Sequence, residues 1–194
     1  MRIEFIIATH KNVEHLKAMI LCLKAQTNPN WIATIAMDGY NQEIDVYATS
    51  LLSPDDKITK HIVMDGPHGD WGHTPIQSAK GYAEEKLLCM TSDDNYYVPT
   101  FVDEMLKPFD DKRCALAYCN MVHNSYGYDL VNTEIARAKI DLGCFVTLTD
   151  FAKQIRLGKG YEDDYVFARD YANTFCSDGL YHTKKIFKVL YVHN

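Results

Sequence analysis

The sequence predicts an α/β fold, a doubly wound and mostly parallel sheet followed by an irregular C-terminal half. Two observations support this fold class. Short apolar runs rich in β-branched residues alternate with helical stripes through the first half of the chain, which is typical of parallel strands connected by helices. In addition, 47% of the 194 residues are hydrophobic, so the chain is able to bury a sizeable core.

Four strands are expected in the first half. Residues 3–8 form an unbroken apolar run, as in a strand that is buried on both faces. The same pattern recurs at residues 31–37, 58–64 and 86–90. Three helices fall between them, over residues 12–27, 45–52 and 75–83. Asn12 is placed as the N-cap of the first helix, Ser53-Pro54 closes the second, and Pro75 lies in the first turn of the third.

The second half is less regular. Helices are expected over residues 99–106, 149–157 and 160–172, and strands over 115–122 and 186–192. Residues 125–128 are predicted as a turn between two extended pieces. Because no repeat, low-complexity tract or linker interrupts the chain, we expect one domain over residues 1–194.

Charge and composition exclude several classes of protein. The net charge of −6 argues against general binding to nucleic acid. To bind an anionic ligand, the chain would need a local positive charge such as a metal ion. The chain contains no run of 18 apolar residues, so no membrane span is expected. The apolar run at residues 3–8 is too short for a signal peptide. Six cysteines without a CxxC pair are interpreted as buried thiols in a reducing compartment, so we expect a cytoplasmic protein.

Polar residues follow the predicted strands of the first half. Thr9, Asp38, the loop 65–72 and the pair Asp93-Asp94 each stand where a strand ends. In doubly wound sheets, ligands bind at the carboxyl ends of the strands. We therefore expect these four exits to converge on one binding site.

The Asp93-Asp94 pair is the first candidate for chemistry. Adjacent carboxylates repel each other unless a cation sits beside them, and oxygen ligands without cysteine favour Mg²⁺ or Mn²⁺. The alternative is an acidic turn that caps the helix near Pro99. The position at the end of the fourth strand favours the metal site.

Three further features carry both a functional and a structural interpretation. Glu162-Asp163-Asp164 provides either a general base or acids that favour a helix start. Trp71, in the glycine-rich loop, stacks on a ligand or folds back on the core. His193 completes a metal site or is simply solvated. The loop 66–73 contains neither GxGxxG nor GxxxxGK[ST], so it does not predict a dinucleotide site or a P-loop.

At this point the chain resembles a family 2 glycosyltransferase with the GT-A fold. The resemblance lies in four segments that follow one another in the family's order. These are residues 4–12 with 23–27, Ala36-Met37-Asp38-Gly39, the DXD-type segment Thr91-Ser92-Asp93-Asp94-Asn95, and the ED-type segment Gly160-Tyr161-Glu162-Asp163-Asp164 with Arg169.

The resemblance implies a role for each matching residue. Asp94 would ligate Mn²⁺ or Mg²⁺ on the donor diphosphate, with Asp93 beside the ribose and the metal. Asp163 would be the general base. The remaining implied contacts are Thr9 and Asp38 with the nucleoside, Cys144 with the sugar, and His193 with the metal; Trp71 is our additional candidate for stacking on the donor.

We therefore expect a metal-dependent inverting glycosyltransferase. Residues 1–98 would form the nucleotide-binding half and residues 99–194 the acceptor-binding and catalytic half. The partners would be a nucleotide-sugar donor, with a UDP-sugar favoured, and a glycan or another hydroxyl acceptor. Two alternatives stay open: a nucleotidyltransferase on a similar sheet, although residues 9–12 carry one lysine and no glycine, and a non-catalytic module that binds a carbohydrate or a partner.

Overall fold

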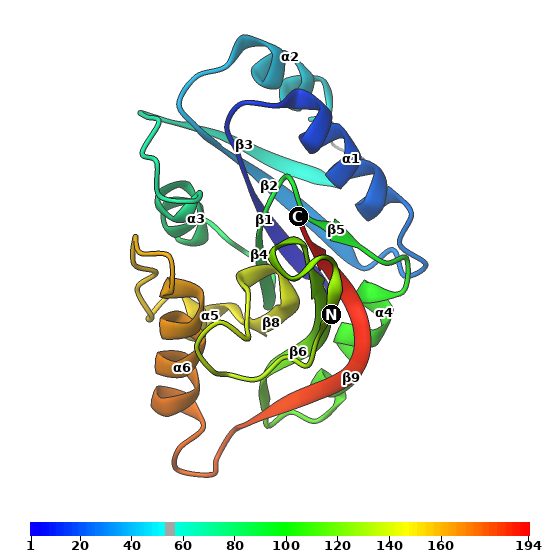
Figure 1. The fold of residues 1–194 in the computed structure, drawn as a ribbon, viewed down its shortest axis with the longest axis vertical. Helices are drawn as coiled ribbons and strands as arrows, with labels where there is room; N and C mark the ends of the chain where they lie inside the picture. The colour runs from blue at the N-terminus through cyan, green and yellow to red at the C-terminus, as the bar shows by residue number, and fades with distance from the viewer. Residues whose placement is uncertain (53–56) are drawn as a thin grey trace.

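A computed structural model of the protein describes residues 1–52 and 57–194, and its strands form one mixed sheet (Figure 1). The strand order is β3-β2-β1-β4-β8-β6-β9-β5, with β7 paired to β6. The first four strands of this order are mutually parallel. Their bounds are β1 Ile3–Thr9, β2 Trp31–Asp38, β3 Ile58–Met64 and β4 Leu87–Ser92. The predicted α/β class and the four predicted strands are confirmed.

Three helices connect the parallel strands. They are α1 (Val13–Lys24), α2 (Gln42–Ser50) and α3 (His73–Lys80). Figure 1 shows α1 and α2 together on one side of the sheet and α3 on the other, as a doubly wound sheet requires. The predicted N-cap is confirmed, since the Asn12 side chain accepts a hydrogen bond from the Glu14 backbone at 3.0 Å. The predicted closure of the second helix by Ser53-Pro54 lies outside the described residues.

The second half extends the sheet with antiparallel pairings. β8 (Phe145–Leu148) is antiparallel to both β4 and β6 (Cys114–His123), and β9 (His182–His193) is parallel to β6. The short strands β5 (Tyr96–Tyr97) and β7 (Asp129–Val131) pair with β9 and β6. The sequence did not predict β8 or β5, because runs of four and two residues carry almost no periodicity.

One of the three remaining helices is much shorter than predicted. α4 (Phe101–Leu106) and α6 (Asp163–Phe175) fall in their expected places, but α5 covers only Thr149–Ala152. The segment after α5 binds α3 instead of continuing the helix: the backbone N–H of Leu157 donates to Gln77 Oε1 at 2.8 Å, and Lys80 Nζ donates to the carbonyl of Ile155. These side chains take up backbone groups that a longer helix would use, so the helix ends early.

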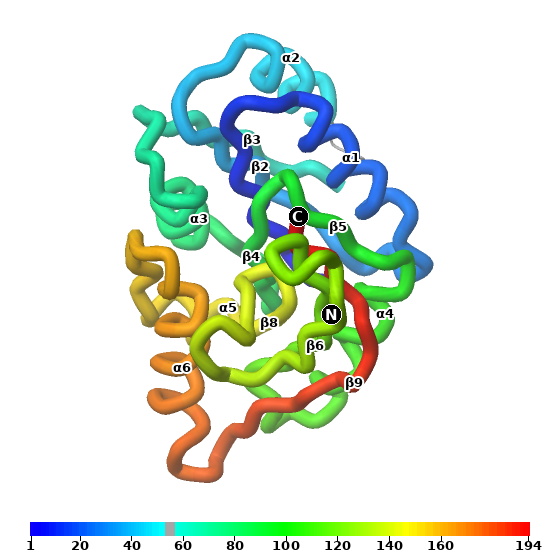
Figure 2. The backbone as a smooth tube through the Cα atoms, in the orientation of Figure 1, coloured from blue at the N-terminus to red at the C-terminus, as the bar shows by residue number. Residues whose placement is uncertain are grey.

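The core lies on both faces of the sheet. β1 and β2 are buried along their entire length, and the apolar residues of α1, namely Leu16, Met19, Ile20 and Leu23, pack on them. All six cysteines are free, and the four on or beside the sheet, Cys89, Cys114, Cys119 and Cys144, are buried. None of the helices in the described ranges combines the length and the apolar composition that crossing a bilayer needs. The backbone trace in Figure 2 places the C-terminus beside β5, and the Asn194 backbone N–H donates to Asn95 Oδ1, just after β4, at 3.2 Å.

Candidate active site

A cleft of about 670 Å³ opens at the carboxyl ends of the parallel strands. Its walls come from the ends of β1, β2 and β4, the loop before α3, the segment 138–142, the start of α6 and the ends of β6 and β9. Six of the predicted site residues line it: Thr9, Asp38, Trp71, Asp93, Asp94 and His193. The expected convergence of the strand exits is therefore observed. Asp163 and Cys144 are not among the lining residues.

The end of β4 places Asp93 against β1. Its backbone N–H donates to the carbonyl of Ala8 at 2.9 Å, and Thr9 Oγ1 donates to Asp93 Oδ2 at 2.5 Å. Burial, assisted by the neighbouring carboxylate of Asp94, raises the pKa of Asp93 to about 6 against the lowering effect of the Thr9 hydrogen bond. Burial also raises the pKa of Asp94. Burial disfavours the charged forms of these two adjacent carboxylates, and a bound cation would stabilise them.

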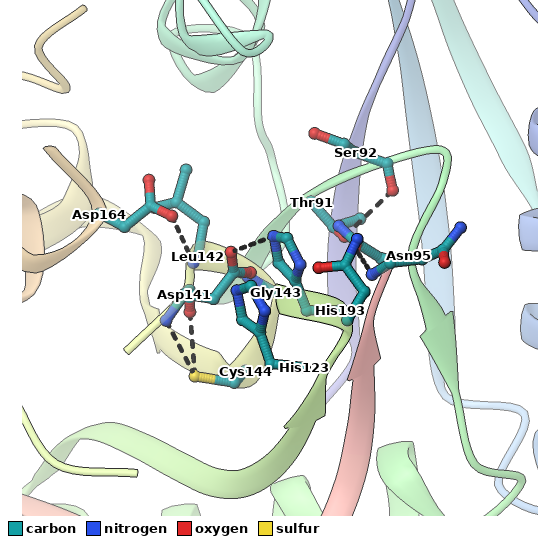
Figure 3. A network of polar contacts seen from close by, with 12 residues as sticks. Thr91, Ser92, Asn95, His123, Asp141, Leu142, Gly143, Cys144, Asp164 and His193 are labelled. Atoms are coloured by element: carbon teal, nitrogen blue, oxygen red, sulfur yellow. Dashed lines mark hydrogen bonds and ion pairs between the residues drawn. The ribbon is translucent and has the colours of Figure 1, made fainter. Parts of the chain in front are cut away.

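A polar network centred on Asp141 lies near Ser92 and Asn95 at the end of β4 (Figure 3). Asp141 Oδ1 accepts from the Tyr191 hydroxyl at 2.6 Å and from the Gly143 backbone at 2.8 Å, and its Oδ2 lies 3.3 Å from His193 Nε2. The His193 ring stacks on His123, with centroids 3.9 Å apart and planes 8° apart. His193 Nδ1 is buried and has no hydrogen-bond partner among the residues that the structure describes, so it is available as a ligand atom.

The start of α6 contributes a further, half-buried carboxylate, that of Asp164. Its Oδ1 lies 3.0 Å from His73 Nε2, and its Oδ2 accepts from the Leu142 backbone at 3.4 Å. Burial raises the pKa of Asp164 to about 6, against the opposing effect of the His73 hydrogen bond. Burial lowers the pKa of His73, but its contacts with Asp164 outweigh burial and leave that pKa raised.

Asp163 contacts the loop before α6 and does not line the cleft. Its carboxylate accepts a hydrogen bond from the Gly160 backbone and lies where a Cβ on Gly158 would be. Asp164 lines the cleft together with Tyr161, Glu162 and Tyr165, whereas Asp163 does not. The structure gives Asp163 a capping contact in the loop and gives Asp164 the position on the cleft wall.

At the end of β2, His68 contacts the carboxylate of Asp38. Both carboxylate oxygens of Asp38 accept from the His68 backbone N–H, at 3.1 and 3.2 Å, and Oδ1 lies 2.5 Å from His68 Nδ1. His10 Nδ1 lies 2.6 Å from the Asp38 carbonyl. A nucleoside at this end of the cleft would meet His10 and His68 together with Asp38.

Trp71 does not fold back on the core, which was one of its two predicted positions. Its side chain is 59% exposed, and its ring meets that of Tyr161 edge to face with centroids 5.9 Å apart. Cys144, in contrast, is fully buried beneath the cleft, where its Sγ donates to the Asp141 carbonyl at 3.0 Å. It supports the backbone that carries Asp141.

Sequence reasoning missed five functional candidates: His68, His73, His123, Asp141 and Asp164 as the cleft-facing acid. Each becomes significant only through a partner that is distant in sequence. His73 and Asp164 are 91 residues apart, and Tyr191 and Asp141 are 50 apart. Usable signals existed for three of them: His68 lies in the loop 65–72 that was expected to reach the site, Asp164 lies in the acidic run 162–164, and His123 follows the predicted strand 115–122.

The carboxylate and imidazole groups of the cleft are suitable ligand types for a divalent cation, but they do not form a complete coordination shell. No three acidic, histidine or cysteine side chains within residues 1–52 and 57–194 converge closely enough to hold a metal ion. The imidazole of His193, the buried carboxylate of Asp93 and the half-buried carboxylate of Asp94 are suitable ligand types. Mg²⁺-type ions are often held by one or two protein ligands together with substrate phosphates, and this donor set matches that pattern.

Comparisons with known proteins identify the fold. No protein-family model and no curated protein sequence matches the chain. Among solved structures, the fragment 1–349 of Staphylococcus aureus TarS is similar with a TM-score of 0.78 at 13% identity, covering 100% of this chain and 60% of that one. The chain spans 37% of the longer TarS chain.

Two further solved structures share the fold. The mannosyltransferase PcManGT from Pyrobaculum calidifontis, in complex with GDP-Man and Mn²⁺, has a TM-score of 0.74 at 13% identity, covering 98% of this chain and 56% of that one. Glucosyl-3-phosphoglycerate synthase from Mycobacterium tuberculosis has a TM-score of 0.68 at 9% identity, covering 100% and 72%. With its mixed sheet and its cleft at the carboxyl ends of the parallel strands, this chain has the GT-A glycosyltransferase fold.

Proposed function

We propose that the protein is a metal-dependent, inverting glycosyltransferase that moves a sugar from a nucleotide-diphosphate donor to a hydroxyl acceptor. The observation that carries the proposal is the presence of two separate acidic groups, Asp93-Asp94 and Asp164, on one cleft of a GT-A fold. A UDP-sugar is the favoured donor. TarS 1–349 has been solved with UDP and with UDP-GlcNAc, whereas PcManGT was solved with GDP-Man, so GDP-sugars are the first alternative.

The acids and histidines at the ends of β4 and β9 would bind the donor diphosphate through a cation. Asp94 and His193 would hold Mn²⁺ or Mg²⁺, with Asp93 on the ribose side. When bound, such an ion neutralises the diphosphate and stabilises the negative charge of the leaving nucleotide. Thr9 and the Asp38–His68 pair would face the nucleoside. This arrangement would attract the donor diphosphate, which a chain of net charge −6 cannot do through its overall charge.

Asp164 is the general base that the geometry favours. It lines the cleft, whereas Asp163, the residue implied by the resemblance, contacts the Gly160 backbone. The acceptor oxygen forms a bond to the anomeric carbon as its proton passes to the Asp164 carboxylate. The bond from that carbon to the diphosphate oxygen breaks on the opposite face, which inverts the configuration. His73 would orient Asp164 through their hydrogen bond.

Two matched variants test the base. Asp164→Asn should lower glycosyl transfer by about 10²- to 10⁴-fold, the usual effect of losing a general base, while nucleotide binding measured by calorimetry stays intact. Asp163→Asn should lower transfer much less, because only a loop contact is lost. The reverse order of the two variants would restore Asp163 as the base.

Product analysis separates the alternatives. Release of a nucleoside diphosphate indicates glycosyl transfer, and release of pyrophosphate indicates a nucleotidyltransferase. A wild-type chain that binds nucleotide sugars in Mn²⁺ but turns over none of a panel of UDP- and GDP-sugars would be a binding module, and the proposed activity would be wrong.

A further inference from the structure

Two exposed aromatic side chains lie at the mouth of the cleft and have no part in the proposed transfer step. Trp71 and Tyr161 both line the cleft, and their ring planes meet at 68°. Tyr161 is 72% exposed, which makes it more open to solvent than Trp71. Ligand sites combine apolar and aromatic walls with a few fixed polar groups. An open aromatic pair in the same cleft as buried acids therefore indicates a surface that a ligand covers.

The backbone holds Trp71 in an uncommon conformation. Its φ of +55° lies in the left-handed region, between Gly69 at +68° and Gly72 at +84°. A bulky residue in this region is an outlier that persists only where its surroundings enforce it, and such outliers cluster at ligand sites. Here the enforcing contact is close packing, because a Cβ on Gly72 would approach Ala8 Cβ to 2.7 Å. The turn that contains Trp71 and Gly72 thus packs closely against the end of β1, while the Trp71 indole remains exposed to solvent.

The aromatic pair lies on the same side of the cleft as the proposed base. The Trp71 ring centroid is 6.4 Å from that of His73, and His73 Nε2 is 3.0 Å from Asp164 Oδ1. Tyr161 precedes Asp164 by three residues in the segment that leads into α6. A molecule resting on the two rings would therefore lie beside the group that takes the acceptor proton.

The charges around the pair disfavour an anionic molecule. Among the described residues that line the cleft, Lys11 is the sole lysine or arginine, while the acids are Asp38, Asp70, Asp93, Asp94, Asp141, Glu162 and Asp164. Near the aromatic pair, Arg137 already forms an ion pair with Glu162. Lys159 is not among the residues that line the cleft. A phosphate-bearing acceptor would meet like charge without a compensating cation.

We propose that Trp71 and Tyr161 form the acceptor platform and that the acceptor is an uncharged sugar. The apolar face of its ring rests on the aromatic rings, and one of its hydroxyls faces Asp164. The identification of this molecule as the acceptor rests on the proposed function. Its hydroxyl oxygen forms the new bond to the anomeric carbon, its proton moves to Asp164, and the nucleoside diphosphate leaves with the electron pair of the broken bond.

Tryptophan fluorescence tests the platform, because the two tryptophans differ in position. Trp31 is buried at 3% exposure and reports on folding, whereas Trp71 is open to the cleft. The full chain is titrated, with UDP and Mn²⁺ present, with both anomers of the methyl glycosides of glucose, galactose, mannose and N-acetylglucosamine. At least one of them should shift the emission to shorter wavelength. Glycerol 3-phosphate and 3-phosphoglycerate should cause no shift.

Variants localise the signal. Tyr161→Ala keeps Trp71 as the probe and should weaken sugar binding about tenfold, the scale of one aromatic contact. Tyr161→Phe should restore the affinity. Trp71→Phe should abolish the shift while Trp31 emission and the circular dichroism spectrum stay native. Tyr82→Ala is the matched control, because Tyr82 is 61% exposed and lies outside the cleft lining, so wild-type binding is expected.

Three outcomes would overturn the inference: no shift with any neutral glycoside, an equal shift with the two phosphates, or unchanged affinity in Tyr161→Ala. Calorimetry with UDP and with GDP is run on the same samples. Nucleotide binding without a sugar response refutes the platform alone. A Tyr161-dependent sugar response without nucleotide binding leaves a sugar site and refutes the proposed transferase.

Discussion

Asp164 combines burial, a histidine partner and a position on the cleft wall. Burial disfavours its charged form and raises its pKa to about 6. A carboxylate with a raised pKa is still ionised at pH 7, and it is a stronger base than one with an ordinary pKa. Asp163 makes a helix-start contact that the macrodipole also favours. The two neighbours illustrate how one acidic run supplies both a structural and a chemical group.

The pH dependence of turnover follows from this pKa. Below about pH 6, Asp164 takes up a proton and can no longer accept one from the acceptor, so kcat/KM should fall about tenfold per pH unit. Above that pH it should level off. Asp93 has a pKa in the same range, so nucleotide affinity is measured across the same pH series to separate the two groups. A kcat/KM that is flat from pH 5 to 8 would contradict the role of Asp164.

At the scale of elements, the site depends on how closely the turn before β8 packs on β9. The 3-10 turn Leu142–Cys144 carries Gly143 against the ring of Tyr191, which is fully buried. A Cβ on Gly143 would overlap that ring. The Tyr191 hydroxyl in turn holds Asp141, which contacts His193. The glycine therefore sets the spacing between two elements that both reach the cleft.

Gly143→Ala should destabilise the protein because neither the buried ring nor the turn has space to move. The expected loss is about 1–3 kcal/mol of unfolding free energy, the usual range for overpacking, measured by urea denaturation. Gly81→Ala serves as the control, since its Cβ would meet only the Ser78 carbonyl at 3.4 Å and its φ is negative; it should be neutral or slightly stabilising. Equal stability of the two variants would show that the contact at Gly143 is easily relieved.

The parallel strands and their helices could be predicted because their signals are local. The apolar run at residues 3–8, the stripe of α1 and its N-cap Asn12 each depend on neighbours within a few residues. β8 could not be predicted, since four residues become a strand only when β4 and β6 lie on both sides. The site divides in the same way. Thr9, Asp38 and Asp93 were predicted from their strand exits, whereas Asp141, His73 and the orientation of Asp164 depend on contacts across the fold.

At the scale of the whole molecule, ligand binding should be visible as added stability. A ligand that binds only the folded state at 100 times its Kd adds about 2.7 kcal/mol, which corresponds to a rise in Tm of several degrees for a domain of this size. UDP with Mn²⁺ should therefore raise the Tm of the wild type in a thermal-shift assay.

The same measurement tests the metal assignment. Asp94→Asn should lose the part of the shift that depends on Mn²⁺, because the variant removes a carboxylate ligand while keeping the shape of the side chain. Lys188→Ala is a suitable control, since Lys188 is exposed and pairs with Glu104, away from the cleft lining. A Mn²⁺-dependent shift that survives in Asp94→Asn would remove Asp94 from the metal site.

The placement of β9 has a consequence for how the protein is made. This strand lies between β6 and β5 although it follows all the other strands in sequence. During synthesis on the ribosome, β6 therefore keeps an unpaired edge until residues 182–193 have emerged. Open edges of this kind invite pairing with other chains, and pairings distant in sequence form slowly. We expect the nascent protein to be most vulnerable to aggregation, and most dependent on chaperones, in the interval before this strand inserts.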